Sequence, residues 1–133
     1  MSEKLSYLSQ EWCAEAERRL RAEIPPEKMK KLTTSVSYVY LDCPGGKTRY
    51  LYFRADKGIF ADVLVGDNEP PAAEFRVTGP YQLFADATQG KISSQRALMS
   101  GKLKLKGHMV KALKLASLAD RINKVLASIP TKY

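Results

Sequence analysis

The chain has 133 residues and a net charge of +8, with 44% hydrophobic and 27% charged residues. This length and composition suit one domain that buries a core without disulfides or metals, and they exclude a disordered protein. The apolar runs are shorter than the roughly 20 residues of a membrane-spanning helix, and the two cysteines match no metal-ligand or redox spacing. We therefore expect a single cytoplasmic domain over residues 1–133, with no metal and no cofactor.

The N-terminal segment is predicted to form an amphipathic helix over residues 2–23. Ser2 is placed as its N-terminal cap, and apolar residues that include Trp12 recur at helical spacing along one stripe. The Pro25-Pro26 pair ends the helix, because a residue before proline avoids the helical region. Trp12 is expected to anchor the core, and Glu27–Leu32 is assigned a further short helical turn.

Four strands are predicted next, and the first three are joined by short turns, so they should form an antiparallel meander. The strands are Thr33–Leu41, Thr48–Ala55, Ile59–Val65 and Ala73–Thr78. Alternation places four residues of the third strand on one side: Ile59, Ala61, Val63 and Val65. In the fourth strand, Phe75 and Val77 are expected to point inward.

Four tyrosines, Tyr38, Tyr40, Tyr50 and Tyr52, are predicted to form a patch on the outward face of this sheet. Three interpretations stay open: cross-strand pairs that stabilise a half-exposed sheet, a subunit interface of a homodimer, or a stacking platform for single-stranded nucleic acid. The strands carry no RNA-recognition signature, so nucleic acid is the least supported of the three.

The C-terminal part is predicted to contain two short helices, a strand and a closing helix. The short helices cover Tyr81–Thr88 and the segment from Ser93 or Ser94 to Met99. Leu103 and Leu105 then alternate with lysines between Gly101 and Gly107, which indicates a strand with one apolar face. Apolar residues recur at helical spacing from Met109 to Leu126, with lysines and arginines among them.

The positive charge is concentrated in this part of the chain. Residues 91–133 contain ten Lys and Arg against Asp120 alone, a balance of +9, whereas residues 1–90 carry a balance of −1. Two interpretations stay open. The lysines either cover a solvated helix face, as lysines often do, or form a surface for an anionic partner such as lipid headgroups, coenzyme A or nucleic acid.

The sequence gives little support to catalysis. The single histidine, His108, is expected to cap the last helix or to be exposed. Cys13 and Cys43 lie in no motif that activates a thiol, and the glycines lack the spacing of a nucleotide-binding loop. We therefore expect no catalytic residues and no enzymatic activity.

The run Gly79–Leu115 resembles the C-terminal half of the sterol carrier protein-2 family of lipid-binding domains. The match is dense and ordered: a Tyr-containing helix, a Gly-Lys stop at residues 90–91, a short helix, and then Met-Ser-Gly-Lys-Leu-Lys-Leu-Lys-Gly at residues 99–107. Looser similarity extends over nearly the whole chain. The chain has Ile92-Ser93-Ser94 where the family often has proline, and it ends in Thr131-Lys132-Tyr133, unlike the peroxisomal address of some members.

The resemblance implies an α+β fold: a five-stranded, mostly antiparallel sheet with helices on one face and an apolar tunnel between them. Such a tunnel would hold a fatty acid, acyl-coenzyme A, phospholipid, sterol or isoprenoid lipid without a covalent bond. The candidate tunnel residues are Phe75, Val77, Phe84, Leu98, Met99, Leu103, Leu105, Met109 and Leu113. The candidate contacts to a headgroup or anionic membrane are Lys102, Lys104, Lys106, Lys111 and Lys114. A protein-interaction module without lipid and a basic nucleic-acid binder are the alternatives.

Overall fold

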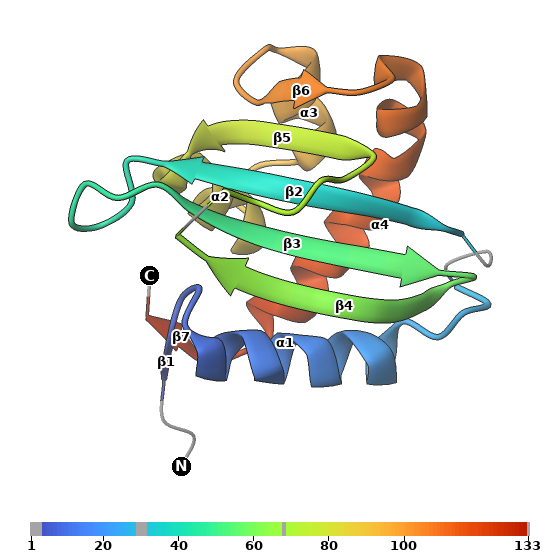
Figure 1. Ribbon diagram of the computed structural model, residues 1–133, viewed down its shortest axis with the longest axis horizontal. Helices are drawn as coiled ribbons and strands as arrows, with labels where there is room; N and C mark the ends of the chain where they lie inside the picture. Colours follow the sequence, from blue (N-terminus) through green and yellow to red (C-terminus); the bar gives the residue numbers. More distant parts are fainter. Residues whose placement is uncertain (1–3, 29–31, 68, 133) are drawn as a thin grey trace.

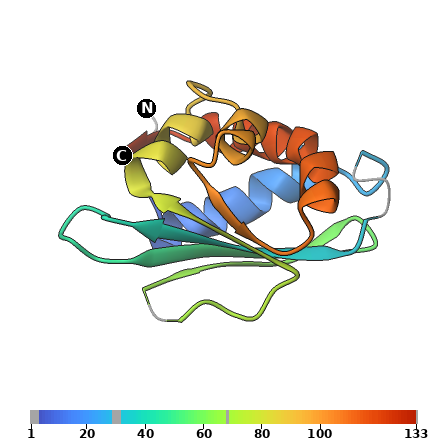
Figure 2. The ribbon, with the colours of Figure 1, turned by 90° about the horizontal axis from the view of Figure 1, so that it is seen from above.

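A computed structural model describes residues 4–28, 32–67 and 69–132. Its main feature is a five-stranded sheet with helices packed on one face (Figures 1 and 2). The predicted α+β architecture is therefore confirmed. A further two-stranded parallel sheet joins the two ends of the chain, where β1 (Leu5–Ser6) pairs with β7 (Thr131–Lys132).

The five strands lie in the order β4-β3-β2-β5-β6. They are β2 (Thr34–Leu41), β3 (Arg49–Asp56), β4 (Ile59–Gly66), β5 (Phe75–Pro80) and β6 (Lys104–Lys106). The predicted meander β2-β3-β4 is antiparallel, as is the β5–β6 pair, whereas β5 runs parallel to β2. The parallel pair arises because the connection from β4 to β5 crosses the sheet face opposite the helices before it enters β5 (Figure 2).

The helices are α1 (Gln10–Glu23), α2 (Tyr81–Thr88), α3 (Ser94–Met99) and α4 (Met109–Ala127). Side chains cap three of them, since a free backbone N–H at a helix start needs an acceptor. Ser9 accepts from the backbone N–H of Trp12, Ser93 from Arg96, and His108 Nδ1 from Lys111. The predicted capping role of His108 is therefore confirmed.

The first helix begins later than predicted. It starts at Gln10 rather than near residue 2, because Leu8 adopts a left-handed backbone conformation with φ of 66° and Ser9 provides the cap. The side chain of Leu8 is fully buried, so core packing holds this turn in place. Ser2 lies outside the described residues, as does part of the segment Glu27–Leu32. A backbone hydrogen bond from Lys28 to Pro25 forms a turn just before that gap.

A β-bulge changes the inward face of β4. Arg54 pairs with Asp62 and Ala55 with Phe60, so Ala61 is an extra residue in the register. Phe60 therefore points inward and is 1% exposed, whereas Ile59 is 56% exposed. The prediction that Ile59 and Ala61 share a face with Val63 and Val65 was wrong, because alternation holds only within an uninterrupted strand.

The four tyrosines lie on opposite faces of the sheet. Tyr38 and Tyr40 point toward the helices, while Tyr52 shares the opposite face with its cross-strand partner Ser37. The connection from β4 to β5 covers part of that opposite face, where the Ser37 hydroxyl donates to the carbonyl of Pro71 at 2.9 Å. The predicted outward patch of all four tyrosines was therefore wrong.

Candidate functional site: an apolar cavity between sheet and helices

A cavity separates the inner face of the sheet from the helices. Its empty volume is about 1070 Å³ when the part open to solvent is counted, and the space within it that a water molecule can enter is about 90 Å³. The sheet contributes mainly apolar side chains, among them Val36, Leu51, Phe53, Phe75, Val77 and Leu105. Helix α4 contributes one stripe at spacings of three and four residues: Ala112, Leu115, Ala119, Ile122 and Leu126. The inward-facing apolar residues of the strands and of α4 thus form the two walls of the cavity.

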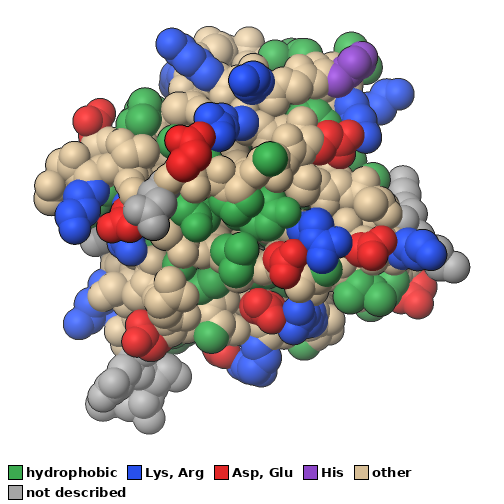
Figure 3. Space-filling view, viewed as in Figure 1, with side chains coloured by type: hydrophobic (Ala, Val, Ile, Leu, Met, Phe, Trp, Pro, Cys, Tyr) green, Lys and Arg blue, Asp and Glu red, His purple; other side chains and the backbone are tan. Residues whose placement is uncertain are grey.

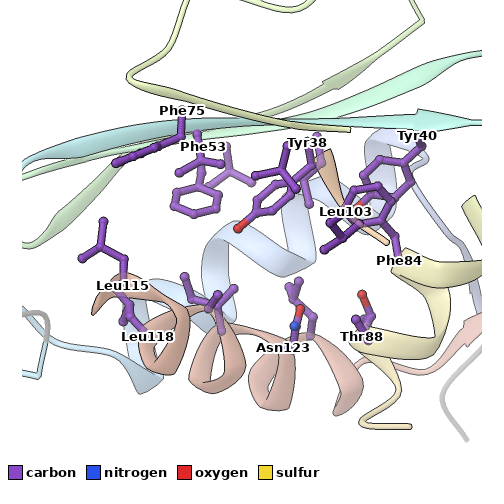
Figure 4. Close-up of a pocket in the computed structure, with 18 of the residues that line it drawn as sticks. Tyr38, Tyr40, Phe53, Phe75, Phe84, Thr88, Leu103, Leu115, Leu118 and Asn123 are labelled. Carbon is purple, nitrogen blue, oxygen red and sulfur yellow. The ribbon is translucent and has the colours of Figure 1, made fainter. Parts of the chain in front are cut away.

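Aromatic rings line the sheet side of the cavity, and Tyr40 and Phe84 pack together at one end of it (Figure 4). The Phe84 ring of α2 stacks on Tyr40 with centroids 4.3 Å apart and an interplanar angle of 9°. The Tyr38 ring meets Phe84 edge-on at 5.8 Å and lies 5.7 Å from Phe53. Because neighbouring rings fix each other, the orientation of this wall is set before any ligand arrives.

A buried hydrogen-bond chain ties this end to the N-terminal segment. The hydroxyl of Tyr7 lies 3.0 Å from the hydroxyls of both Tyr40 and Thr88. Burial, with the neighbouring Tyr7 as a smaller cause, raises the pKa of Tyr40 well above its usual value. The ring of Tyr7 also meets Trp12 edge-on at 4.9 Å. Sequence reasoning missed this chain, although the serines that alternate with Tyr38 and Tyr40 in β2 indicated an inward position for both rings.

At the other end, charged groups lie at the rim beside an apolar interior. The Thr34 hydroxyl donates to Glu74 Oε1 at 2.6 Å, and Lys111 forms an ion pair with the second oxygen of Glu74. The hydrogen bond from Lys111, and to a smaller degree the one from Thr34, lowers the pKa of the Glu74 carboxyl. Lys111 Nζ also lies 5.9 Å from the ring centroid of Phe75, which lines the cavity. Glu74, which directly precedes β5, therefore joins β2 to α4.

The structure brings six of the nine predicted tunnel residues to the cavity wall. They are Phe75, Val77, Phe84, Leu98, Leu103 and Leu105. Met99 and Met109 are instead 69% and 45% exposed, and Leu113 packs against the core outside the wall. Met109 and Leu113 fall off the inward stripe of α4, because each residue turns about 100° around a helix axis. Met99 follows the buried Leu98 in α3 for the same reason.

The predicted lysines lie on the surface near β6 and the start of α4. Lys102, Lys104, Lys106 and Lys114 are exposed, whereas Lys111 is half-buried and paired with Glu74. Figure 3 shows basic side chains and the single histidine over this end of the molecule. The glycine before α4 allows a tight approach: Gly107 has φ of +138°, and a Cβ there would come within 2.7 Å of the Phe75 ring.

The two cysteines are buried and free. Burial, with a smaller effect of Glu17, raises the pKa of Cys13 to about 11, so its thiol stays protonated and donates to the carbonyl of Val63. Burial also raises the pKa of Cys43. Within the described ranges, no group of His, Cys, Asp and Glu is arranged to hold a metal ion. None of the helices described is long and apolar enough to cross a membrane.

Comparison with known proteins relates this geometry to one family. A sequence model of the SCP-2 sterol transfer family matches residues 14–120. A crystal structure of sterol carrier protein 2 superposes with a TM-score of 0.80 at 19% identity, covering 93% of this chain and 99% of that one. A Thermus thermophilus protein, described as possibly a sterol carrier protein, gives 0.77 at 19% identity, covering 98% and 94%.

A third solved structure, palmitated sterol carrier protein 2 like 2 of Aedes aegypti, gives a TM-score of 0.60 at 17% identity, covering 83% of this chain and 93% of that one. At these identities, the solved structures show a shared fold. A search of curated protein sequences finds no match.

Proposed function

The chain belongs to the SCP-2 sterol transfer family, and on that basis we propose that it binds one lipid non-covalently in its cavity and transfers or presents it. Lipid binding and transfer is the general function that the family supports. The observation that carries the proposal is the lining of the cavity: the described residues that line it include no Lys, Arg, His, Asp or Glu. Such a wall suits the hydrocarbon part of a fatty acid, acyl-coenzyme A, phospholipid, sterol or isoprenoid lipid.

The energetics of apolar transfer fit a carrier. Each buried methylene contributes about 0.8 kcal/mol, so a sixteen-carbon chain gains on the order of 12 kcal/mol relative to water. A bilayer offers nearly the same gain. Exchange between membrane and cavity is then close to neutral, and a carrier of this kind needs no chemical step to load or release its lipid.

The segment from residue 99 to residue 110 is the proposed contact with an anionic membrane. It exposes three apolar side chains, Met99, Met109 and Val110, in the same stretch as three exposed lysines, Lys102, Lys104 and Lys106. Lysines near an anionic surface attract it, and apolar side chains enter its interfacial region. The exposed methionines thus take a different role from the one expected from the sequence.

The lipid-binding proposal is tested first by native mass spectrometry of the purified chain, followed by organic extraction. We expect one lipid per chain, or uptake of added palmitate or hexadecanol by the delipidated protein. A protein that is isolated empty and takes up neither lipid would contradict the proposal.

Membrane docking is tested separately with a triple variant, Lys102→Glu, Lys104→Glu and Lys106→Glu, in co-sedimentation with phosphatidylserine-containing vesicles at low salt. We expect binding to weaken by about a hundredfold, since each lysine near such a surface contributes about 1 kcal/mol. The matched control reverses three exposed lysines elsewhere: Lys4, Lys47 and Lys91. Equal losses in both variants would show that net charge, rather than this segment, governs docking.

A further inference from the structure

One polar group in the cavity wall has no partner among the described residues. The other polar side chains of the wall are engaged: Trp12 with Thr131, Thr34 with Glu74, Tyr40 and Thr88 with Tyr7, and Asn123 with a further group. The hydroxyl of Tyr38 has no hydrogen bond to any residue that the structure describes. Figure 4 shows it pointing from the sheet into the cavity, toward α4. A hydroxyl in an apolar space gains free energy when it finds a hydrogen-bond partner.

This hydroxyl is held in place and stays protonated. Its ring is fixed between Phe53 and Phe84, and the backbone of β2 is paired on both sides, with β3 and β5. Burial, and to a smaller degree the negative charge of Asp120, raises the pKa of Tyr38. The group is therefore a hydrogen-bond donor at every physiological pH.

The surroundings of Tyr38 oppose an anion. Among the described lining residues there is no cation to pair with a carboxylate, and the charge that acts on Tyr38 is the negative one of Asp120. Transfer of an unpaired carboxylate into an apolar site costs far more than transfer of a hydroxyl or carbonyl. The nearby cation Lys111 is already paired with Glu74 at the rim.

We propose that the hydroxyl of Tyr38 donates a hydrogen bond to an uncharged oxygen of the bound lipid, so that the cavity selects lipids with a buried hydroxyl or carbonyl over lipids that would bring a carboxylate inside. This inference rests on the proposed lipid binding and specifies its ligand class. A second observation supports the proposal. The hydroxyl of Tyr40, two residues away, is hydrogen-bonded to Tyr7, so Tyr38 is left as the free donor among the described residues of the wall.

The test compares three ligands of equal chain length, 1-hexadecanol, palmitate and hexadecane, delivered from cyclodextrin to the delipidated full chain at pH 8. Fluorescence of Trp12, which lines the cavity, reports occupancy. We expect the wild type to bind hexadecanol at least about tenfold more tightly than palmitate. Tyr38→Phe should weaken hexadecanol by about fivefold, the size of one hydrogen bond, and leave hexadecane unchanged.

Tyr40→Phe is the matched control. It removes a hydroxyl from the same wall that is already bonded to Tyr7, so it should shift hexadecanol and hexadecane affinities by the same factor. Equal effects of Tyr38→Phe on the hexadecanol and hexadecane affinities would overturn the proposed hydrogen bond from Tyr38. Wild-type protein that binds palmitate as tightly as hexadecanol would overturn the proposed selectivity. The ligand comparison in the wild type needs no variant, so it decides the selectivity even if Tyr38→Phe does not fold. Failure of all three ligands to bind would instead overturn lipid binding itself.

Discussion

The two ends of the cavity are built from different interactions. The tyrosine end, formed by Tyr7, Tyr40, Phe84 and Thr88, combines ring stacking with a chain of buried hydrogen bonds. The leucine end, where Leu115 and Leu118 face Phe75, is lined mainly by aliphatic side chains, and these two leucines are partly exposed. Figure 4 shows Tyr40, Phe84 and Thr88 at one end of the space and Phe75, Leu115 and Leu118 at the other.

Because of this difference, we expect the tyrosine end to be rigid and the leucine end to be adaptable. Stacked rings and hydrogen bonds have defined geometry, so the tyrosine end fixes sheet and helix α2 relative to each other. Dispersion contacts between aliphatic side chains have no directional requirement and tolerate displacement. The leucine end is instead joined at its rim by the contacts of Glu74 with Thr34 and Lys111. We therefore expect stability to depend mainly on the tyrosine end.

The largest predicted effect is the contrast between Phe84→Ala and Leu118→Ala. Phe84 is 5% exposed and touches two tyrosine rings, so its truncation should lower the free energy of unfolding by about 3–5 kcal/mol. Leu118 is only partly buried and already borders empty space, so about 1 kcal/mol is expected. Urea unfolding of both variants measures the difference. Equal losses would mean that the two ends contribute alike.

A smaller effect distinguishes the members of the hydrogen-bond chain. Tyr7→Phe removes the central hydroxyl, so the hydroxyls of Tyr40 and Thr88 both lose their hydrogen bond to Tyr7. We expect the free energy of unfolding to fall by about 2–3 kcal/mol. Tyr40→Phe leaves the bond between Tyr7 and Thr88 intact and should cost about 1 kcal/mol. Thermal and urea unfolding would give the order of the two variants. The reverse order would show that Tyr7 is not the centre of the chain.

The smallest predicted effect concerns the rim at the leucine end. Hydrogen bonds from Lys111 and Thr34 hold the pKa of Glu74 below its unfolded value of about 4.3. The resulting stabilisation is therefore present above that value and is lost as the pH falls through the lower, folded pKa. Because the side chain is 35% exposed, solvent screening limits it to less than about 1 kcal/mol at pH 7.

Glu74→Gln measures this contribution. Its stability deficit against the wild type, followed by urea unfolding from pH 7 downward, should shrink below about pH 4 and disappear once Glu74 is protonated in both states. A deficit that stays constant over this range would assign the effect to packing rather than charge.

Much of the fold follows from local pattern. Alternation correctly placed Phe75 and Val77 of β5 on the inner face, and the glycines at 101 and 107 bracket β6 as expected. Periodicity also identified α4, and the resemblance of Gly79–Leu115 indicated the family. These features are set by residues close in sequence, so the sequence determined them by itself.

Tertiary structure decided the rest. The bulge at Ala61 turns Phe60 inward, and no local pattern in β4 signals it. Ser35 and Ser37 on the opposite face of β2 favour an inward direction for Tyr38 and Tyr40, but residues outside the strand decide which face the helices cover. Burial is decided by neighbours from distant parts of the chain. For that reason the free hydroxyl of Tyr38, the residue on which the ligand hypothesis rests, is visible only in the folded protein.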